Sequence, residues 1–270
     1  MRTVLAALAA LMISSMIGGP GVAQEAPHDA ALTELTTADA TRGWEAVGRI
    51  DIGRSAFCTG TLIAPALVLT AAHCLYDSQS AALYPTESIR FLAGWRNGRA
   101  EAYRGVRRAM AHPDYVFASD DKMDRVAYDL ALMELDQPIR LPSVKPFDVA
   151  PDPGAGDTVA VVSYALDRAE APSMQDACHV LGRQPGFMVL TCNVDFGSSG
   201  APIFSIRDGV AQIVSVVSAK AEMEGRDVSL ATAMEVPLTE LRAAFAAPSA
   251  VPKVRVLGGG GAGGAKFVRP

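Results

Sequence analysis

The chain has 270 residues, of which 50% are hydrophobic, and its formal net charge is −5. Because acidic and basic residues are interspersed, neither nucleic acid nor an anionic membrane surface is expected as the main partner. The composition is that of a protein with an ordinary soluble surface.

Residues 1–23 have the layout of a secretory signal peptide: Arg2 gives a positive start, an apolar run follows, and small residues occupy 21–23. The apolar run is shorter than the ~20 residues that cross a bilayer, and Gly and Pro follow it. We therefore expect export to the periplasm or the extracellular space, without stable membrane insertion. Residues 24–42 are then a polar N-terminal pro-region or extension.

Short apolar runs separated by turn residues follow this extension. Runs of this length at such spacing are typical of an all-β barrel or sandwich. They cover residues 47–52, 57–63, 67–70, 89–93, 106–112 and 131–135. A Pro-rich passage at 138–156 then interrupts the pattern, and we interpret it as the link between two halves.

A second set of runs covers residues 159–163, 179–183, 187–192, 202–206, 210–217 and 228–234. The period then changes, because Leu238, Leu241 and Phe245 are spaced to share one helical face. This spacing predicts a terminal helix over residues 237–247. The Gly-rich residues 248–270 cannot pack a core, and we expect a flexible tail there.

The cysteines number four: Cys58, Cys74, Cys178 and Cys192. Their count is even and no Cys-x-x-Cys pair occurs. In an oxidising compartment this favours two structural disulfides over a zinc site. We therefore expect no metal.

Three motifs indicate the chemistry: His73 in TAAHC, Asp129 in YDLAL and Ser199 in FGSSGAP, in that order along the chain. A serine hydroxyl is a poor nucleophile until an imidazole takes its proton, and a carboxylate must hold that imidazole in one tautomer. The three motifs therefore predict a serine peptidase with His73, Asp129 and Ser199 as its triad.

Each motif also has a simpler interpretation. A histidine beside a cysteine can be structural, and most single aspartates are turn residues or helix caps. Gly-Ser strings are usually turns, and FGSSGAP superficially matches the nucleophile turn of α/β-hydrolases. Those enzymes need a histidine after the serine, and none occurs beyond His179. His28, His112 and His179 themselves are interpreted as structural.

On these motifs the chain resembles the chymotrypsin/trypsin-like serine peptidases, in particular their secreted bacterial branch, over residues 43–247. The resemblance implies an all-β fold of two antiparallel six-stranded barrels, at about 43–140 and 157–236, with the active site between them and a C-terminal helix. It also implies the disulfides Cys58–Cys74 and Cys178–Cys192. The implied activity is that of a secreted endopeptidase that cleaves protein or peptide substrates through an acyl-enzyme, without a cofactor.

The resemblance also assigns the oxyanion hole and a substrate-binding strand. The amides of Gly197 and Ser199 are expected to converge on the developing oxyanion, since small residues let the backbone curl there. Ser215 matches the strand that pairs with substrate, and its hydroxyl is a candidate to orient Asp129. An ordinary strand serine is the alternative.

The resemblance also places Asn193 at the base of the specificity pocket, Ser229 on its wall and Val217 at its mouth. None carries a charge, so a small or medium uncharged residue is expected before the scissile bond. Glutamate-specific relatives have a histidine where this chain has Val214, and a glutamate preference is therefore not expected.

Ser198 departs from the pattern of the animal enzymes, which have an aspartate there that pairs with a newly released N-terminus. Activation by such an ion pair is not expected, because an ammonium group would find no carboxylate. A catalytically inactive homologue that acts as a protein-binding module is the alternative from another functional class. Inactive relatives commonly lose a triad residue, and here all three are present. Hydrolysis of small esters alone is a third alternative.

Overall fold

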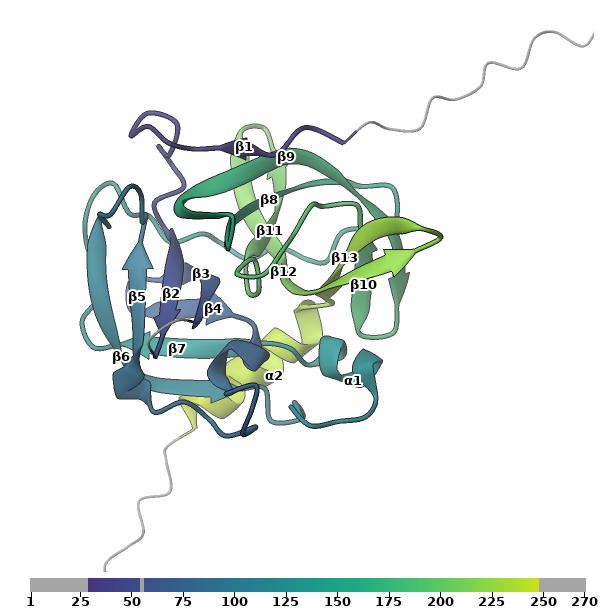
Figure 1. The fold of residues 1–270 in the computed structure, drawn as a ribbon, viewed down its shortest axis with the longest axis horizontal. Coiled ribbons are helices and arrows are strands. Elements are labelled where there is room, and N and C mark those ends of the chain that lie inside the picture. The colour runs from purple at the N-terminus through teal and green to yellow at the C-terminus, as the bar shows by residue number, and fades with distance from the viewer. Residues whose placement is uncertain (1–28, 54–55, 248–270) are drawn as a thin grey trace, which may run out of the picture.

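The computed structural model describes residues 29–53 and 56–247. The predicted signal peptide and Gly-rich tail lie outside these residues. Two β units lie side by side, and a C-terminal helix packs beneath them (Figure 1). No helix of the described residues is long and apolar enough to cross a membrane.

The first unit is a closed barrel of antiparallel strands in the order β2-β3-β4-β7-β6-β5. Large apolar side chains such as Phe91, Leu62 and Met133 fill its interior, because alternate residues of each strand face inward. The strands are β2 (Val47–Ile52), β3 (Ala56–Ala64), β4 (Leu67–Thr70), β5 (Ile89–Ala93), β6 (Ala102–Ala111) and β7 (Ala131–Leu135).

The second unit is built from β8 to β13, in the order β9-β10-β13-β12-β11-β8, and the pairing of β8 with β9 completes the ring. A further short strand, β1 (Thr33–Glu34), adds to the edge of β9. The ring strands are β8 (Thr158–Ala165), β9 (Arg168–Gln184), β10 (Phe187–Leu190), β11 (Pro202–Arg207), β12 (Val210–Met223) and β13 (Arg226–Thr232). The predicted double-barrel fold is confirmed.

Helix α2 (Glu235–Ala246) joins the two barrels. Its buried residues Leu238, Leu241 and Phe245 pack in one cluster with Leu132 of the first barrel and Phe204 of the second. This confirms the predicted terminal helix and explains its apolar face.

Shorter helices lie in the connections between strands of the first barrel. The 3₁₀ turn η1 (Ala72–Leu75) follows β4, and η2 (Thr86–Ser88) precedes β5. The helix α1 (Lys122–Ala127) lies just before β7 and was not predicted. Asp121 caps α1 by accepting hydrogen bonds from the amides of Met123 and Asp124, a common way to satisfy the free amides of a first helical turn.

Candidate active site

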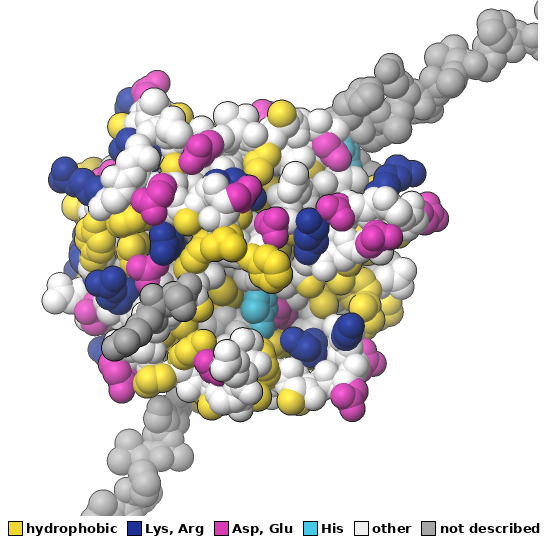
Figure 2. Space-filling view, in the orientation of Figure 1, with side chains coloured by type: hydrophobic (Ala, Val, Ile, Leu, Met, Phe, Trp, Pro, Cys, Tyr) yellow, Lys and Arg dark blue, Asp and Glu magenta, His cyan; other side chains and the backbone are white. Residues whose placement is uncertain are grey.

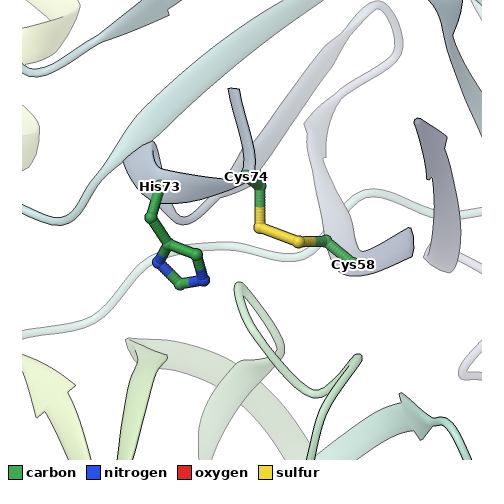
Figure 3. Close-up of side chains that lie close together, drawn as sticks. All are labelled: Cys58, His73 and Cys74. Carbon is green, nitrogen blue, oxygen red and sulfur yellow. A yellow bond between two sulfur atoms is a disulfide. The ribbon is translucent and has the colours of Figure 1, made fainter. Parts of the chain in front are cut away.

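His73 is held in place by the residues on either side of it. It lies in η1, whose buried Ala72 and Leu75 anchor the turn. The disulfide between Cys74 and Cys58 ties the same turn to β3. Figure 3 shows the imidazole of His73 pointing down toward the green segments of the second barrel. Both sulfurs near the ring are bonded to each other, so they are not the thiolates that zinc would need.

Asp129 fixes the orientation of that imidazole. Its Oδ2 lies 2.7 Å from His73 Nδ1, and its Oδ1 accepts a hydrogen bond of 2.9 Å from the His73 amide. The carboxylate is only 3% exposed. This pairing keeps the proton on Nδ1 and leaves Nε2 free to accept another, which is the tautomer that a general base needs.

The electrostatics of His73 reflect this partner. Burial by itself would lower the pKa of His73, but the charge and hydrogen bond of Asp129 outweigh it, and the pKa is raised above its usual 6.5. The nearby Arg125 guanidinium acts in the opposite direction and lowers the pKa. Because a general base must be neutral, activity should fall as the pH drops through this raised value.

The effect of Arg125 on His73 can be measured directly. In Arg125→Gln the opposing positive charge is gone, so the pKa of His73 should rise further. The acid limb of the kcat/KM profile for a neutral peptide should then move to higher pH, with less activity at pH 6 and no loss of the alkaline plateau. Lys122→Gln, on the same helix, is the control and should leave the midpoint in place. An unchanged midpoint in Arg125→Gln would contradict this electrostatic account.

The loop that carries Ser199 is fastened to the first barrel by its backbone. Thr59 Oγ1 donates to the Gly197 carbonyl at 2.8 Å, and the Thr59 amide donates to the Ser199 carbonyl at 2.9 Å. A Cβ at Gly200, where φ is +76°, would lie 2.1 Å from Thr70 Oγ1. The loop can therefore approach the barrel so closely only with glycine at this position.

The two amides predicted to bind an oxyanion are available for that role. Gly197, with φ at +97°, lets the backbone curl just before Ser199. Neither the Gly197 amide nor the Ser199 amide has a hydrogen-bond partner among the described residues. The Ser199 hydroxyl is likewise without a bond to His73 in this part of the chain, as is common before substrate tightens the geometry.

His73, Asp129 and Ser199 border one cavity of about 830 Å³, which is also lined by residues of both barrels. Figure 2 shows a histidine in the hollow at the centre of the viewed face, with hydrophobic side chains along its rim. On the second barrel the lining includes Ser218, Ala219 and Lys220 of β12 and Leu230 of β13. The His73, Asp129 and Ser199 side chains therefore share a space in the size range of ordinary ligand pockets.

Ser215 does not orient Asp129, and that part of the sequence interpretation is wrong. Its hydroxyl donates to the Thr232 carbonyl at 2.6 Å instead. Ser218 takes the predicted role, since its hydroxyl donates to Asp129 Oδ2. A β-bulge accounts for the direction of the Ser218 side chain, since the pairing of β12 with β13 shifts register between Val217 and Ala219. Such bulges re-aim a side chain.

A matched pair of variants tests this correction. Ser218→Ala removes a hydrogen bond to a buried carboxylate, and bonds to charged groups contribute about 1.5–3 kcal/mol. We expect kcat to fall about 10- to 100-fold. Ser215→Ala should change kcat by no more than about twofold, because its bond to a strand carbonyl is remote from His73. The reverse ranking in steady-state kinetics would restore the original assignment.

The three predicted pocket residues do not line the cavity that contains the triad. Val217 is 2% exposed and packs in the core of the second barrel. Ser229 is fully buried, and its hydroxyl has no partner among the described residues. Asn193 is exposed and begins residues 193–199, the loop that leads to the predicted nucleophile Ser199 and is called the nucleophile loop. Their contact with substrate stays a prediction.

Comparison with known proteins identifies the family. The family model described as Trypsin matches residues 36–235. The chain belongs to the trypsin family. The implied disulfides Cys58–Cys74 and Cys178–Cys192 are present, as is the double-barrel fold of trypsin-like proteins.

Relatives within the trypsin family come from bacteria and insects. A glutamyl endopeptidase of Bacillus licheniformis is 26% identical over 54% of this chain and 45% of its own length. A modular serine protease of Drosophila melanogaster is 37% identical over 32% of this chain and 14% of its length. A trypsin of Phaedon cochleariae is 36% identical over 33% of this chain and 32% of its length. The chain thus spans less than half the length of these curated relatives.

A solved structure of a Glu endopeptidase in complex with MPD has a TM-score of 0.66 to this structure, at 20% identity. The match covers 82% of this chain and 98% of the other. At that identity the likeness concerns the fold, and it agrees with the trypsin-like arrangement of two barrels and a terminal helix.

Proposed function

We propose that the protein is a serine endopeptidase that hydrolyses peptide bonds through an acyl-enzyme on Ser199. The observation that carries this proposal is the His73 imidazole, bonded through Nδ1 to the buried Asp129 at 2.7 Å, facing the same cavity as Ser199. The amides of Gly197 and Ser199 have no hydrogen-bond partner among the described residues. They can supply the second requirement of acyl transfer, which is stabilisation of an oxyanion.

The proposed reaction has two halves. His73 Nε2 takes the proton of the Ser199 hydroxyl as its Oγ attacks the carbonyl carbon, and the oxyanion is held by the amides of Gly197 and Ser199. His73 then gives the proton to the departing amine, which leaves an ester on Ser199. Water, activated by the same imidazole, attacks this ester and frees the second product. Asp129 remains ionised and stabilises the imidazolium in both halves.

Hydrolysis of a peptide library by the purified mature protein tests this function. Cleavage of internal peptide bonds that an organophosphate-type serine reagent abolishes is the expected result. Binding of peptides without cleavage would support the alternative of an inactive binding module. Hydrolysis of small esters alone would support the third alternative.

Charge around the cavity supports a preference for acidic side chains near the scissile bond. Lys122, Arg125 and Lys220 all line it, whereas its one carboxylate, Asp129, is buried against His73. The similarity to a glutamyl endopeptidase points the same way. This proposal differs from the sequence-based expectation of an uncharged residue and of no glutamate preference, which depended on Asn193, a residue outside that cavity's lining.

Lys220 is the residue to change for this preference, because it lies two residues after Ser218 on the strand that borders the cavity and, although it is ion-paired with the exposed Asp227 at 3.0 Å, is half exposed. In Lys220→Glu the ratio of kcat/KM for acidic over neutral peptides should fall about tenfold or more, since like charges repel where opposite charges attracted. Lys145→Glu, at another cavity, gives the same change in net charge and should preserve the ratio. An unchanged ratio in Lys220→Glu would contradict the assignment.

We also propose that the protein is exported to the periplasm or the extracellular space. Two disulfides fit an oxidising compartment, and residues 1–23 have the composition of a signal peptide. Recovery of the mature chain outside the cytoplasm, with its new N-terminus near Gln24, would test this.

A further inference from the structure

The segment at residues 29–35 lies along the second barrel as an added strand. The Ala30 amide donates to the Ala177 carbonyl at 2.8 Å, and the Leu35 amide donates to the Pro172 carbonyl at 2.8 Å. Between them, Thr33 pairs with Met174. Figure 1 shows this purple segment crossing the second barrel beside β9. A stretch expected to be a pro-region or extension is thus part of the folded domain.

Asp29 connects this segment to the residues that precede the nucleophile loop. Its Oδ1 lies 2.9 Å from His179 Nδ1 and accepts a hydrogen bond from the Thr191 hydroxyl. The Thr191 hydroxyl in turn accepts a hydrogen bond of 2.8 Å from the His179 amide. One carboxylate therefore holds β9 and Thr191 together, immediately beside the Cys178–Cys192 bridge.

Gln175 makes a second connection, which reaches the loop itself. This side chain is 4% exposed and uses both ends of its amide. Nε2 donates to the Ala30 carbonyl at 2.9 Å, and Oε1 accepts a hydrogen bond of 2.7 Å from the Asn193 amide. Asn193 begins the loop that leads to Gly197 and Ser199. Two hydrogen bonds thus join the N-terminal segment to the start of that loop.

We propose that residues 29–35 act as an internal positioning element for the nucleophile loop, with Asp29 and Gln175 as positioning residues. The inference rests on the proposed peptidase function. Ser198, beside the proposed nucleophile, is uncharged and buried, so it offers no carboxylate for an ion pair that would order this loop. The segment supplies a substitute in which hydrogen bonds to Thr191 and Asn193 fix where the loop starts. The Gly197 and Ser199 amides then need no further ordering to face an oxyanion.

The test compares variants of the full mature chain. Gln175→Met removes both hydrogen bonds at similar volume, Gln175→Glu keeps an acceptor for the Asn193 amide, and Asp29→Ala releases His179 and Thr191. Thr33→Ala is the control, because its exposed side chain lies in the same segment and makes no side-chain hydrogen bond among the described residues. The readouts are kcat and KM, the rate of Ser199 labelling by a fluorophosphonate, and hydrogen exchange at residues 193–199.

Gln175→Met and Asp29→Ala should each lower kcat and the labelling rate about tenfold, as expected for loss of one or two buried hydrogen bonds. KM should change less than about twofold. Hydrogen exchange should accelerate at residues 193–199 but not in the first barrel. Gln175→Glu should recover part of the loss, and Thr33→Ala should match the wild type.

Three results would overturn the proposal: unchanged kcat and exchange in both Gln175→Met and Asp29→Ala, faster exchange throughout the molecule, or an equal loss in Thr33→Ala. If the wild type neither cleaves peptides nor reacts with the fluorophosphonate, the peptidase function fails. Hydrogen exchange at residues 193–199 still decides the positioning role in that case, because it needs no activity.

Discussion

Replacing Ser199 by alanine is expected to lower kcat by about a millionfold, because the proposed mechanism uses this hydroxyl as the attacking group and forms the acyl-enzyme on it. The fold should persist, since the side chain makes no hydrogen bond among the described residues and its loop is held through backbone atoms. Steady-state peptide hydrolysis measures the loss, and thermal unfolding measures the fold.

Ser198→Ala is the matched control for that experiment. This neighbouring hydroxyl is buried, 3.3 Å from both Ser163 Oγ and the Tyr164 carbonyl. Its removal should affect mainly stability, by about 1 kcal/mol, and leave peptide hydrolysis measurable. Normal cleavage by Ser199→Ala would show that another residue is the nucleophile. Equal loss of activity in the two variants, with both folded, would also argue against Ser199 as the attacking group.

Asp129→Asn should lower kcat by about 10⁴-fold at neutral pH. An amide at this position can donate its N–H to His73 Nδ1, which favours the tautomer that carries its proton on Nε2. That tautomer cannot accept the proton of Ser199. The pKa of His73 should also fall, because the charge and hydrogen bond that raise it are lost. The kcat value and the pH profile of kcat/KM report the two effects separately.

Asp124→Asn provides the control for this substitution. It removes an acidic charge from the exposed surface of α1, close to Asp129 in sequence. Activity should remain within about twofold of wild type, because exposed charges interact weakly in water. A comparable loss in both variants would mean that Asp129 contributes only through general negative charge, and not through its hydrogen bonds to His73.

Much of the fold could be predicted because its strands alternate in burial or form short apolar runs. The predicted runs at 47–52, 67–70, 89–93 and 131–135 coincide with β2, β4, β5 and β7. Turn residues such as Gly53, Pro65 and Gly94 bound several of these strands, and their apolar side chains fill a barrel. The periodicity of α2 was equally clear, since its three buried residues share one helical face.

The elements that were missed have no such signal. The first half of β9, residues 168–178, has many polar residues and a mixed burial pattern, so its sequence does not indicate a strand. It is extended because it pairs with β8 and β1. β12 was expected to end at Val217 but extends to Met223. The extension contains Ser218 and Lys220, so the partner of Asp129 and a charged residue of the cavity were both missed. A bulge cannot be read from sequence spacing, because it depends on the register of the neighbouring strand.

The site residues also divide into those with a local sequence signal and those without one. The gathering of His73, Asp129 and Ser199 at one cavity could be predicted because each lies in a short recognisable motif, and their catalytic roles stay a prediction. Gln175 and Asp29 have no motif, and their contacts join residues 18 and 150 positions apart in the sequence. Only the folded chain brings these groups together.

Activation of the Ser199 hydroxyl can be measured through the mass of the protein after reaction with a fluorophosphonate, followed by peptide mapping. The proposed mechanism predicts one adduct per chain, located on Ser199. The rate of labelling should rise with pH through the raised pKa of His73, and denaturation should abolish it. An adduct on another residue, or none on folded protein that retains its two disulfides, would contradict the assignment of Ser199 as an activated nucleophile.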